Sequence, residues 1–161
     1  MVIILMGVAG SGKTTIGQFL AQDLHWSFVD ADDLHPAANI EKMKSGRPLD
    51  DADREPWLAA ISARIKRFLA DGENGIVTCS ALKQKYRDVI VVDPASVKLV
   101  HLHGSPDVLL QRIQGRKNHF MSPRMLESQL QTLEIPATAF RVDIQNSPAA
   151  IVAEIRQHFQ L

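Results

Sequence analysis

The sequence predicts an α/β fold in which helices cover both faces of a parallel sheet of five strands. A short apolar, β-branched stretch at residues 2–6 leads directly into a glycine-rich loop, and apolar residues at helical spacing follow that loop. Further apolar stretches alternate with amphipathic ones along the chain, and such alternation is typical of parallel strands joined by right-handed helical crossovers. The length fits a single domain over residues 1–161.

The composition is that of an ordinary globular protein, with 45% hydrophobic residues and 18 residues of each charge. A net charge of zero argues against a protein dedicated to nucleic acid or to a membrane surface. The single cysteine, Cys79, excludes an internal disulfide, and no apolar run approaches the roughly 20 residues that span a bilayer. The chain begins with a strand rather than a charged leader, so we expect a cytoplasmic protein.

A phosphate-binding loop is predicted where the first strand ends, because the pattern G-x-x-x-x-G-K-[ST] stands between a strand and a helix. Its glycines permit positive φ angles, so that backbone N–H groups turn inward around phosphate oxygens beside the positive end of the helix. We expect Lys13 to contact the β- and γ-phosphates of ATP and the Thr14 hydroxyl to ligate Mg²⁺. A glycine-rich turn that binds nothing is the alternative. The loop consists of Gly7, Val8, Ala9, Gly10, Ser11, Gly12, Lys13, Thr14 and Thr15.

Three acidic residues follow the second predicted strand, which covers residues 26–29. Asp30, Asp32 and Asp33 lie at the carboxyl end of this strand, where α/β sheets bind their ligands. One of the three is expected to cap the next helix, but three carboxylates exceed what a cap requires. At least one of them is therefore expected to hold Mg²⁺ or to accept a proton from the substrate.

Two helices are predicted in the middle of the chain. The first begins near residue 36 with a proline and is ended by a glycine and a second proline. The second takes Asp51 or Asp53 as its N-cap and Pro56 in its first turn, and a buried apolar stripe follows. Arg54, at the start of this second helix, either pairs with a nearby aspartate in solvent or clamps an anion or hydroxyl of the substrate.

The third predicted strand, residues 75–79, is almost entirely apolar, as expected of a parallel strand that is buried on both faces. Ser80 is the expected cap of the following helix. Lys83 and Arg87 are four residues apart and share one face of that helix, which is either solvated or turned toward the substrate. Cys79 is expected in the core rather than as a nucleophile.

The fourth and fifth strands are predicted at residues 97–102 and 141–144, and a basic segment between them is predicted to form a lid over residues 114–124. Arg112 and Arg116 are four residues apart and are expected to close over the phosphates, where they stabilise charge in the transition state. By position alone, residues just after the fifth strand are candidates for contact with the base of the nucleotide.

Together these blocks resemble the small phosphate-loop type of gluconate kinase (gluconokinase) over nearly the whole chain. The phosphate loop is common to many kinases, and the other blocks are more specific. One departure is Asn118, where the family is expected to have glycine. The specific blocks are Leu34-His35-Pro36 with Asn39-Ile40-Glu41-Lys42-Met43, Asp53-Arg54 with Trp57, Cys79-Ser80-Ala81-Leu82-Lys83 with Tyr86-Arg87-Asp88, Arg116-Lys117 with His119-Phe120, and Ser128-Gln129-Leu130 with Leu133-Glu134.

The resemblance implies the fold of nucleoside monophosphate kinases and shikimate kinase, with strand order 2-3-1-4-5, and a homodimer. It implies transfer of phosphate from ATP, with Mg²⁺, to the 6-hydroxyl of D-gluconate, which gives 6-phosphogluconate. By analogy with shikimate kinase, Asp30 holds Mg²⁺ through water and Asp32 contacts the substrate hydroxyl, although the two roles can be exchanged.

The mechanism expected from these roles is direct in-line transfer, with Lys13, Asp32 and Arg116 as catalytic residues. A kinase of another small anionic acceptor, such as shikimate or a nucleoside monophosphate, is the alternative within enzymes. A nucleotide-dependent switch is the alternative outside them, and the guanine motif N-K-x-D is missing from the sequence. The residues expected to bind gluconate are Asp32, His35, Arg54, Lys83 and Arg87, those expected to bind the nucleotide are the loop with Arg112 and Arg116, and those expected at the metal are Thr14 and Asp30.

Overall fold

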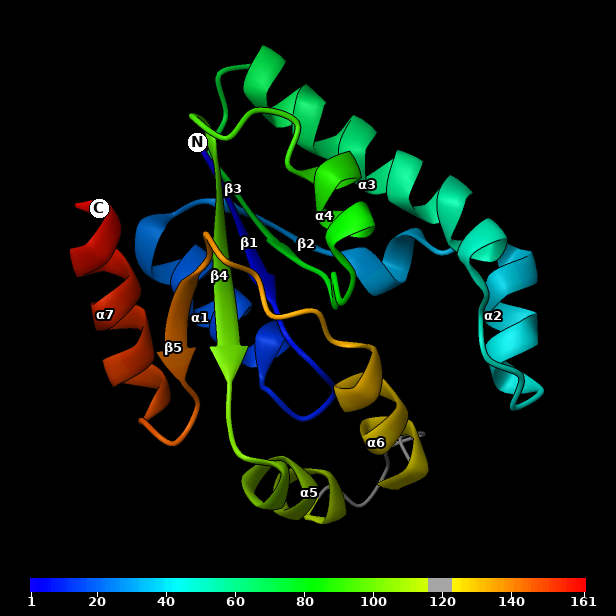
Figure 1. Cartoon of the computed structure of the whole chain (residues 1–161). Coiled ribbons are helices and arrows are strands. Elements are labelled where there is room, and N and C mark those ends of the chain that lie inside the picture. Colours follow the sequence, from blue (N-terminus) through cyan, green and yellow to red (C-terminus); the bar gives the residue numbers. More distant parts are fainter. Residues whose placement is uncertain (116–122) are drawn as a thin grey trace.

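The computed structural model describes residues 1–115 and 123–161, and within them a five-stranded parallel sheet has helices on both faces (Figure 1). The strands lie in the order β2-β3-β1-β4-β5, and every neighbouring pair is parallel. The predicted fold class and strand order are therefore confirmed. The strands are β1 Val2–Met6, β2 Ser27–Asp30, β3 Gly75–Thr78, β4 Val97–His103 and β5 Phe140–Asp143.

Helices α1 and α7 pack on one face of the sheet, and α3 and α4 pack on the other (Figure 1). Helices α5 and α6 lie beyond the carboxyl ends of the strands. Within the described ranges, no helix combines the length and the apolar character needed to cross a bilayer. The helices are α1 Lys13–Leu24, the 3₁₀ helix η1 Ala31–Leu34, α2 Ala37–Lys44, α3 Asp51–Ala70, α4 Gln84–Ile90, α5 Pro106–Gln114, α6 Pro123–Thr132 and α7 Pro148–Phe159.

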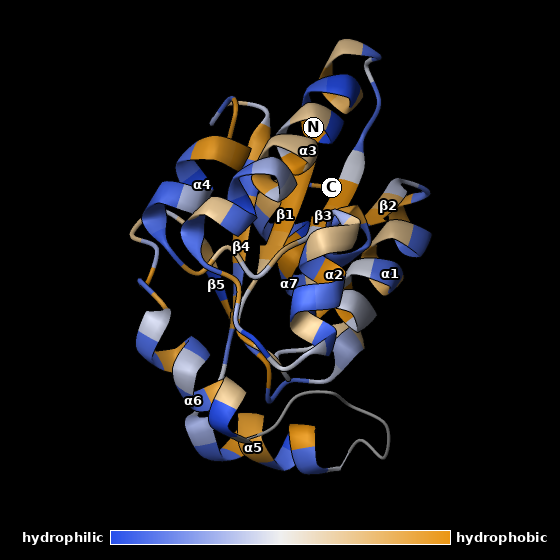
Figure 2. Cartoon of the chain, turned by 90° about the vertical axis from the view of Figure 1, so that its right-hand side faces the viewer, coloured by the Kyte–Doolittle hydropathy of each residue, from blue (hydrophilic) through white to orange (hydrophobic). Residues whose placement is uncertain are grey.

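Strand β1 is the centre of the core. It pairs with β3 on one edge and with β4 on the other, and all its residues are fully buried. Ile3 and Leu5 belong to the core beneath α1 and α7, and the alternate residues belong to the core beneath α3 and α4. Figure 2 shows the hydrophobic residues concentrated on the strands between more polar helices. An unbroken apolar stretch is what a strand buried on both faces requires.

The N-cap of helix α3 lies one residue before the first cap expected from the sequence. The N-cap is Asp50, not Asp51 or Asp53, and its side chain accepts a hydrogen bond from the backbone N–H of Asp53. The Asp53 carboxylate accepts in return from the backbone N–H of Asp50, which completes a capping box. Pro56 consequently lies inside the helix rather than in its first turn, and that expectation was wrong.

The expected cap of α4 was also wrong. Ser80 lies before the helix, which begins at Gln84 after Lys83, and no side chain of Lys83 caps it. The backbone N–H of Gln84 instead donates to the carboxylate of Glu134, a residue that follows α6. The start of α4 is therefore stabilised by a partner 50 residues away, which no local sequence signal reveals.

His101 in β4 is a buried ionisable group with an incomplete set of hydrogen bonds. Its side chain is 3% exposed, and Nδ1 has no hydrogen-bond partner among the described residues. Burial, together with the nearby positive charges of His103, Arg141 and Arg87, lowers the pKa of the imidazole from 6.5 to about 4.

Acidification is therefore expected to destabilise the fold between pH 6.5 and about 4. In this window the unfolded chain binds a proton at His101 and the folded chain does not. The free energy of unfolding therefore decreases as the pH is lowered, by about 3 kcal/mol over the full window. Chemical unfolding at a series of pH values measures this loss. The variant His101→Gln should show a shallower dependence on pH, and a dependence equal to that of the wild type would contradict the assignment.

Candidate active site

The candidate site lies at the carboxyl ends of the strands, where the chain leaves β1 and enters the phosphate loop. Gly10 and Gly12 have φ angles of +80° and +86°, a region that favours glycine. At Gly7 a Cβ atom would lie 2.6 Å from the carbonyl oxygen of Leu102, so a side chain has no room there. Three glycines of the predicted loop are thus required by its backbone path.

Helix α1 begins at Lys13 with Gly12 as its N-cap. No side chain caps this end, and its first turn contains no acidic residue. The N–H groups at the start of a helix need a partner, and the helix dipole favours an anion there. The amino end of α1 is therefore suited to bind a phosphate group. The Lys13 ammonium lies over the same loop, with Nζ 3.2 Å from the carbonyl oxygen of Val8.

The structure brings Thr14 and Asp30 together, although they come from different elements. The Thr14 hydroxyl donates to Oδ2 of Asp30 over 2.9 Å, while Oδ1 of Asp30 accepts from the backbone N–H of Asp32 over 3.2 Å. Asp30 is thereby the N-cap of η1, a short helix that the sequence did not predict. The predicted helix, α2, has Pro36 as its N-cap and no side-chain cap, so the expectation that one of the three aspartates caps it was wrong. A hydroxyl and a carboxylate beside a phosphate loop are hard oxygen ligands of the kind that fit Mg²⁺, which commonly takes one or two protein ligands together with substrate phosphates.

Asp32 lies on η1 next to this pair. Its side chain is reached by solvent, but protein surrounds it on most sides, and this burial raises the pKa of its carboxyl. The negative charge of Asp30 acts in the same direction, and the positive charge of Lys13 opposes it. A carboxylate with a raised pKa is the better proton acceptor, so Asp32 has the chemistry of a general base.

A second wall of the site is built on α3. The His35 ring stacks on Trp57 with centroids 4.4 Å apart and planes inclined by 10°. The indole Nε1 donates to the carbonyl oxygen of Ala31 over 2.6 Å, which ties this wall to the start of η1. Burial of the ring, and next the charge of Arg54, lower the pKa of His35. The ring is therefore held in its neutral form near pH 7.

Arg54 does not form the solvated aspartate pair that the sequence left open. In the described part of the chain it makes no ion pair, and its Nη1 donates to the carbonyl oxygen of Leu49 over 2.6 Å. Its guanidinium lies 5.6 Å from the centre of the Tyr86 ring. A half-buried cation with backbone and aromatic partners retains its full charge toward an anionic ligand.

Lys83 and Arg87 do not present one cationic face. Lys83 precedes α4 and forms an ion pair with Asp51 at 3.3 Å. Arg87 is 2% exposed, and its Nη1 donates to the carbonyl oxygens of Ala81 and Leu82, over 2.9 and 3.1 Å. Its Nε and Nη2 groups donate to the side-chain amide oxygen of Gln84. The interpretation that Arg87 lies on a solvated helix face is therefore wrong. Its predicted contact with the substrate stays a prediction.

Two features of the site were missed from the sequence. The carboxylate of Asp51 accepts hydrogen bonds from Lys83, Lys85 and the hydroxyl of Tyr86, and these hold the pKa of Asp51 well below its usual range. In addition, the backbone N–H of Ala9 in the phosphate loop donates to Oε1 of Gln129 on α6, over 2.6 Å. The helical pattern around these residues indicates a face but not a partner.

Beside the phosphate loop lies a pocket of about 270 Å³, which opens next to the amino end of α1. The guanidinium of Arg112 borders it and donates to the carbonyl oxygen of Ile144. The predicted residues after the fifth strand are thus part of a cavity at the loop. Arg116 and most of the predicted lid, residues 114–124, lie outside the described residues. The pocket is lined by Gly12, Thr15, Ile16, Arg112, Asn146, Pro148 and Ile151.

Similarity to known proteins agrees with this geometry. A family model described as an AAA domain matches residues 2–136. The gluconokinase of Gluconobacter oxydans (strain 621H) is 42% identical over 161 residues, which cover 98% of this chain and 90% of the relative. Solved structures are similar over the full fold. A gluconokinase from Sinorhizobium meliloti 1021 has a TM-score of 0.84 and 42% identity, and covers 99% of this chain and 96% of its own.

A sugar kinase from Janibacter sp. HTCC2649 has a TM-score of 0.89 and 37% identity, over 99% of this chain and 94% of that one. These similarities extend well beyond the phosphate loop, because they span both walls of the site and the helices behind them. The matched region contains the phosphate loop, the two aspartates after β2 and the second wall on α3. The chain belongs to the gluconokinase family.

Proposed function

We propose that the protein transfers the γ-phosphate of ATP to the 6-hydroxyl of D-gluconate and forms 6-phospho-D-gluconate. The observation that carries this proposal is the convergence of Lys13, Thr14, Asp30 and Asp32 at one point, with the cation Arg54 near His35 on the second wall. The first group is suited to a metal–phosphate complex and to a hydroxyl acceptor. Arg54 is suited to bind an acid, and gluconate is an acid. The names of the relatives support the same substrate.

ATP binds with its phosphates in the loop and its base toward the pocket beside Arg112. The uncapped N–H groups of α1 and the Lys13 ammonium bind the triphosphate. Thr14 and Asp30 would hold Mg²⁺, which neutralises charge on the β- and γ-phosphates when it is bound. Arg112 and Arg116 are the further cations proposed to stabilise the charge that develops during transfer.

The acceptor lies between Asp32 and the wall on α3. Asp32 orients the hydroxyl and takes its proton as the oxygen attacks phosphorus. His35, Arg54, Lys83 and Arg87 are proposed to contact the remaining hydroxyls and the carboxylate, for which a two-pronged guanidinium contact is the natural anchor. A homodimer, which the resemblance implies, is part of the same proposal, and so is the expected place in the cytoplasm.

A panel of acceptors tests the proposed function. Phosphorylation by ATP is measured with D-gluconate, other sugar acids, shikimate and nucleoside monophosphates at equal concentrations. We expect D-gluconate to give by far the highest kcat/KM, because it combines an anionic end with a primary hydroxyl at the far end of the chain. Transfer to shikimate or to a nucleoside monophosphate in preference to gluconate would establish the alternative instead.

The role of Asp32 is tested against its neighbour on the same 3₁₀ helix. Asp32→Asn should lower kcat by roughly 10²–10⁴-fold, since general-base catalysis contributes about that much, while the Kd of ATP changes little. Asp33→Asn is the matched control, because it makes the same change one position further along the same 3₁₀ helix, at a residue that is not assigned to the site. Steady-state kinetics and nucleotide titration measure the two effects. Equal losses in both variants would contradict a specific role for Asp32.

The contact between Gln129 and the phosphate loop gives a second prediction. Gln129→Glu keeps an acceptor for the N–H of Ala9 but adds a negative charge beside the triphosphate. We expect KM for ATP to rise about tenfold, which corresponds to about 1.4 kcal/mol, with little change in KM for gluconate. Gln131→Glu adds the same charge to an exposed position of α6 and should change neither constant. A rise in the gluconate constant alone would refute this arrangement.

A further inference from the structure

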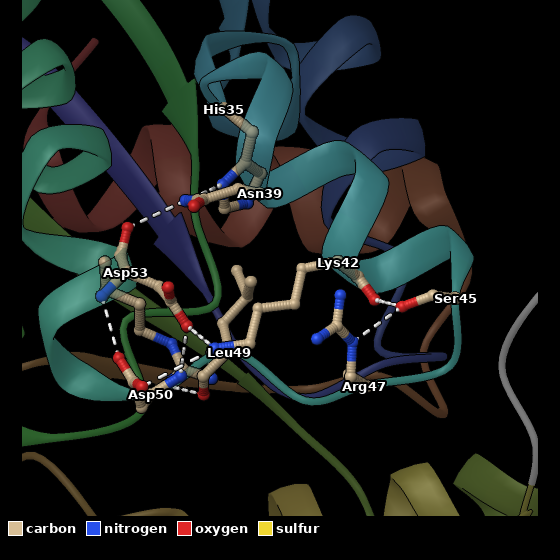
Figure 3. A network of polar contacts seen from close by, with 9 residues as sticks. His35, Asn39, Lys42, Ser45, Arg47, Leu49, Asp50 and Asp53 are labelled. Atoms are coloured by element: carbon tan, nitrogen blue, oxygen red, sulfur yellow. Dashed lines mark hydrogen bonds and ion pairs between the residues drawn. The ribbon is translucent and has the colours of Figure 1, made fainter.

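Helix α2 is an exposed arm with one buried polar residue. Asn39 is 4% exposed, whereas Ile40 and Met43 on the same helix are 37% and 42% exposed. The arm contacts the start of α3 through side chains that Figure 3 shows as one network. Lys42 forms ion pairs with Asp50 and Asp53 of the capping box, and Asn39 donates a hydrogen bond to the backbone carbonyl oxygen of Asp53. A buried carboxamide requires an explanation, because leaving its polar groups unpaired is costly.

The orientation of the Asn39 carboxamide is fixed by an atom that can only accept. Its nitrogen, Nδ2, donates to the backbone carbonyl oxygen of Asp53 over 2.8 Å. The reversed orientation would place the amide oxygen against that carbonyl, where neither atom has a hydrogen to offer. Nδ2 must therefore face Asp53, and its second hydrogen remains for another acceptor.

That acceptor is Nδ1 of His35, which lies 3.4 Å from the same Nδ2 (Figure 3). An amide nitrogen has no lone pair to accept with, so Nδ1 of the ring must be unprotonated. A neutral imidazole carries its single proton on the other nitrogen. The contact therefore assigns His35 to the Nε2–H form. Trp57, stacked on the ring, fixes its plane, and Arg54 is the charged group that opposes a second proton.

We propose that Asn39 is a positioning residue that holds His35 as a neutral Nε2–H donor toward the sugar acid. This inference rests on the proposed function, because the substrate supplies the acceptor. A hydroxyl that gives its hydrogen to Asp32 or to another acceptor still has lone pairs, and an N–H group of fixed direction satisfies one of them. The other form of the ring would present a lone pair at Nε2 and would lose this contact.

The form of the ring is measured directly by long-range ¹H–¹⁵N NMR of the labelled full chain without substrate. We expect the His35 pattern of an Nε2–H ring in the wild type. Asn39→Asp replaces the donor by a carboxylate, which accepts from Nδ1–H, so a proton should appear on Nδ1. If the ring of the wild type carries its proton on Nδ1, or if Asn39→Asp leaves Nδ1 unprotonated, the inference is wrong whatever the substrate is.

Lys42→Met is the matched control for a merely structural role. It removes the ion pairs that tie α2 to the capping box and leaves Asn39 and His35 in place. We expect KM for gluconate to rise about tenfold in Asn39→Leu and much less in Lys42→Met, with the His35 pattern unchanged in the latter. Equal increases in the two variants would show that Asn39 only anchors the arm, and would overturn the proposal.

A pair of substitutions at His35 covers the case in which the Asn39 variants fail to fold. His35→Gln can place an amide N–H where the ring had Nε2–H, whereas His35→Glu offers only acceptors. The glutamine variant should retain at least about tenfold more activity toward gluconate than the glutamate variant. Equal activities, or a more active glutamate variant, would contradict the donor role. Absence of gluconate phosphorylation in the wild type would instead refute the proposed function and leave the NMR result standing.

Discussion

The burial of β1 on both faces and along both edges is the constraint on which the rest of the structure depends. A strand enclosed by β3 and β4, with cores above and below it, has no freedom to shift its end point. The phosphate loop begins at that end point, and Gly7 is in contact distance of the backbone of β4. The direction of α1, and with it the position of Lys13 and Thr14, is therefore set by the core rather than by the loop itself.

The turn that leads to Lys83 is held by polar contacts between distant segments. Glu134 accepts from the amide of Gln84, and its own backbone N–H donates to the carbonyl oxygen of Leu82 over 2.9 Å. Arg87 holds the neighbouring carbonyl of Ala81, a residue with a φ angle of +45° that a non-glycine residue rarely adopts. The buried guanidinium thus stabilises a strained turn that leads to Lys83. Arg87, which was predicted from the sequence to bind the substrate, therefore also has a structural role.

What the sequence could predict was set by local pattern, and what it could not predict was set by partners far along the chain. The phosphate loop, the aspartates after β2 and the alternation of strands and helices are local signals, and they led to the fold. The position of Arg87 in the helical repeat indicated a face, but only the carbonyl oxygens of Ala81 and Leu82 explain its burial. The N-cap of α3 was misplaced because Asp50, Asp51 and Asp53 lie close together and all have the chemistry of a cap.

The arrangement of charge distinguishes among the cations proposed to bind the acid. Lys83 shares the carboxylate of Asp51 with Lys85 and Tyr86, so a substrate carboxylate that used Lys83 would have to compete with an anion already in place. Arg54 has a backbone carbonyl and an aromatic face as partners, and neither carries a full charge. A carboxylate that binds Arg54 therefore neutralises it without displacing another anion. For this reason we expect Arg54, rather than Lys83 or the buried Arg87, to be the main determinant of selectivity for an acid in the proposed site.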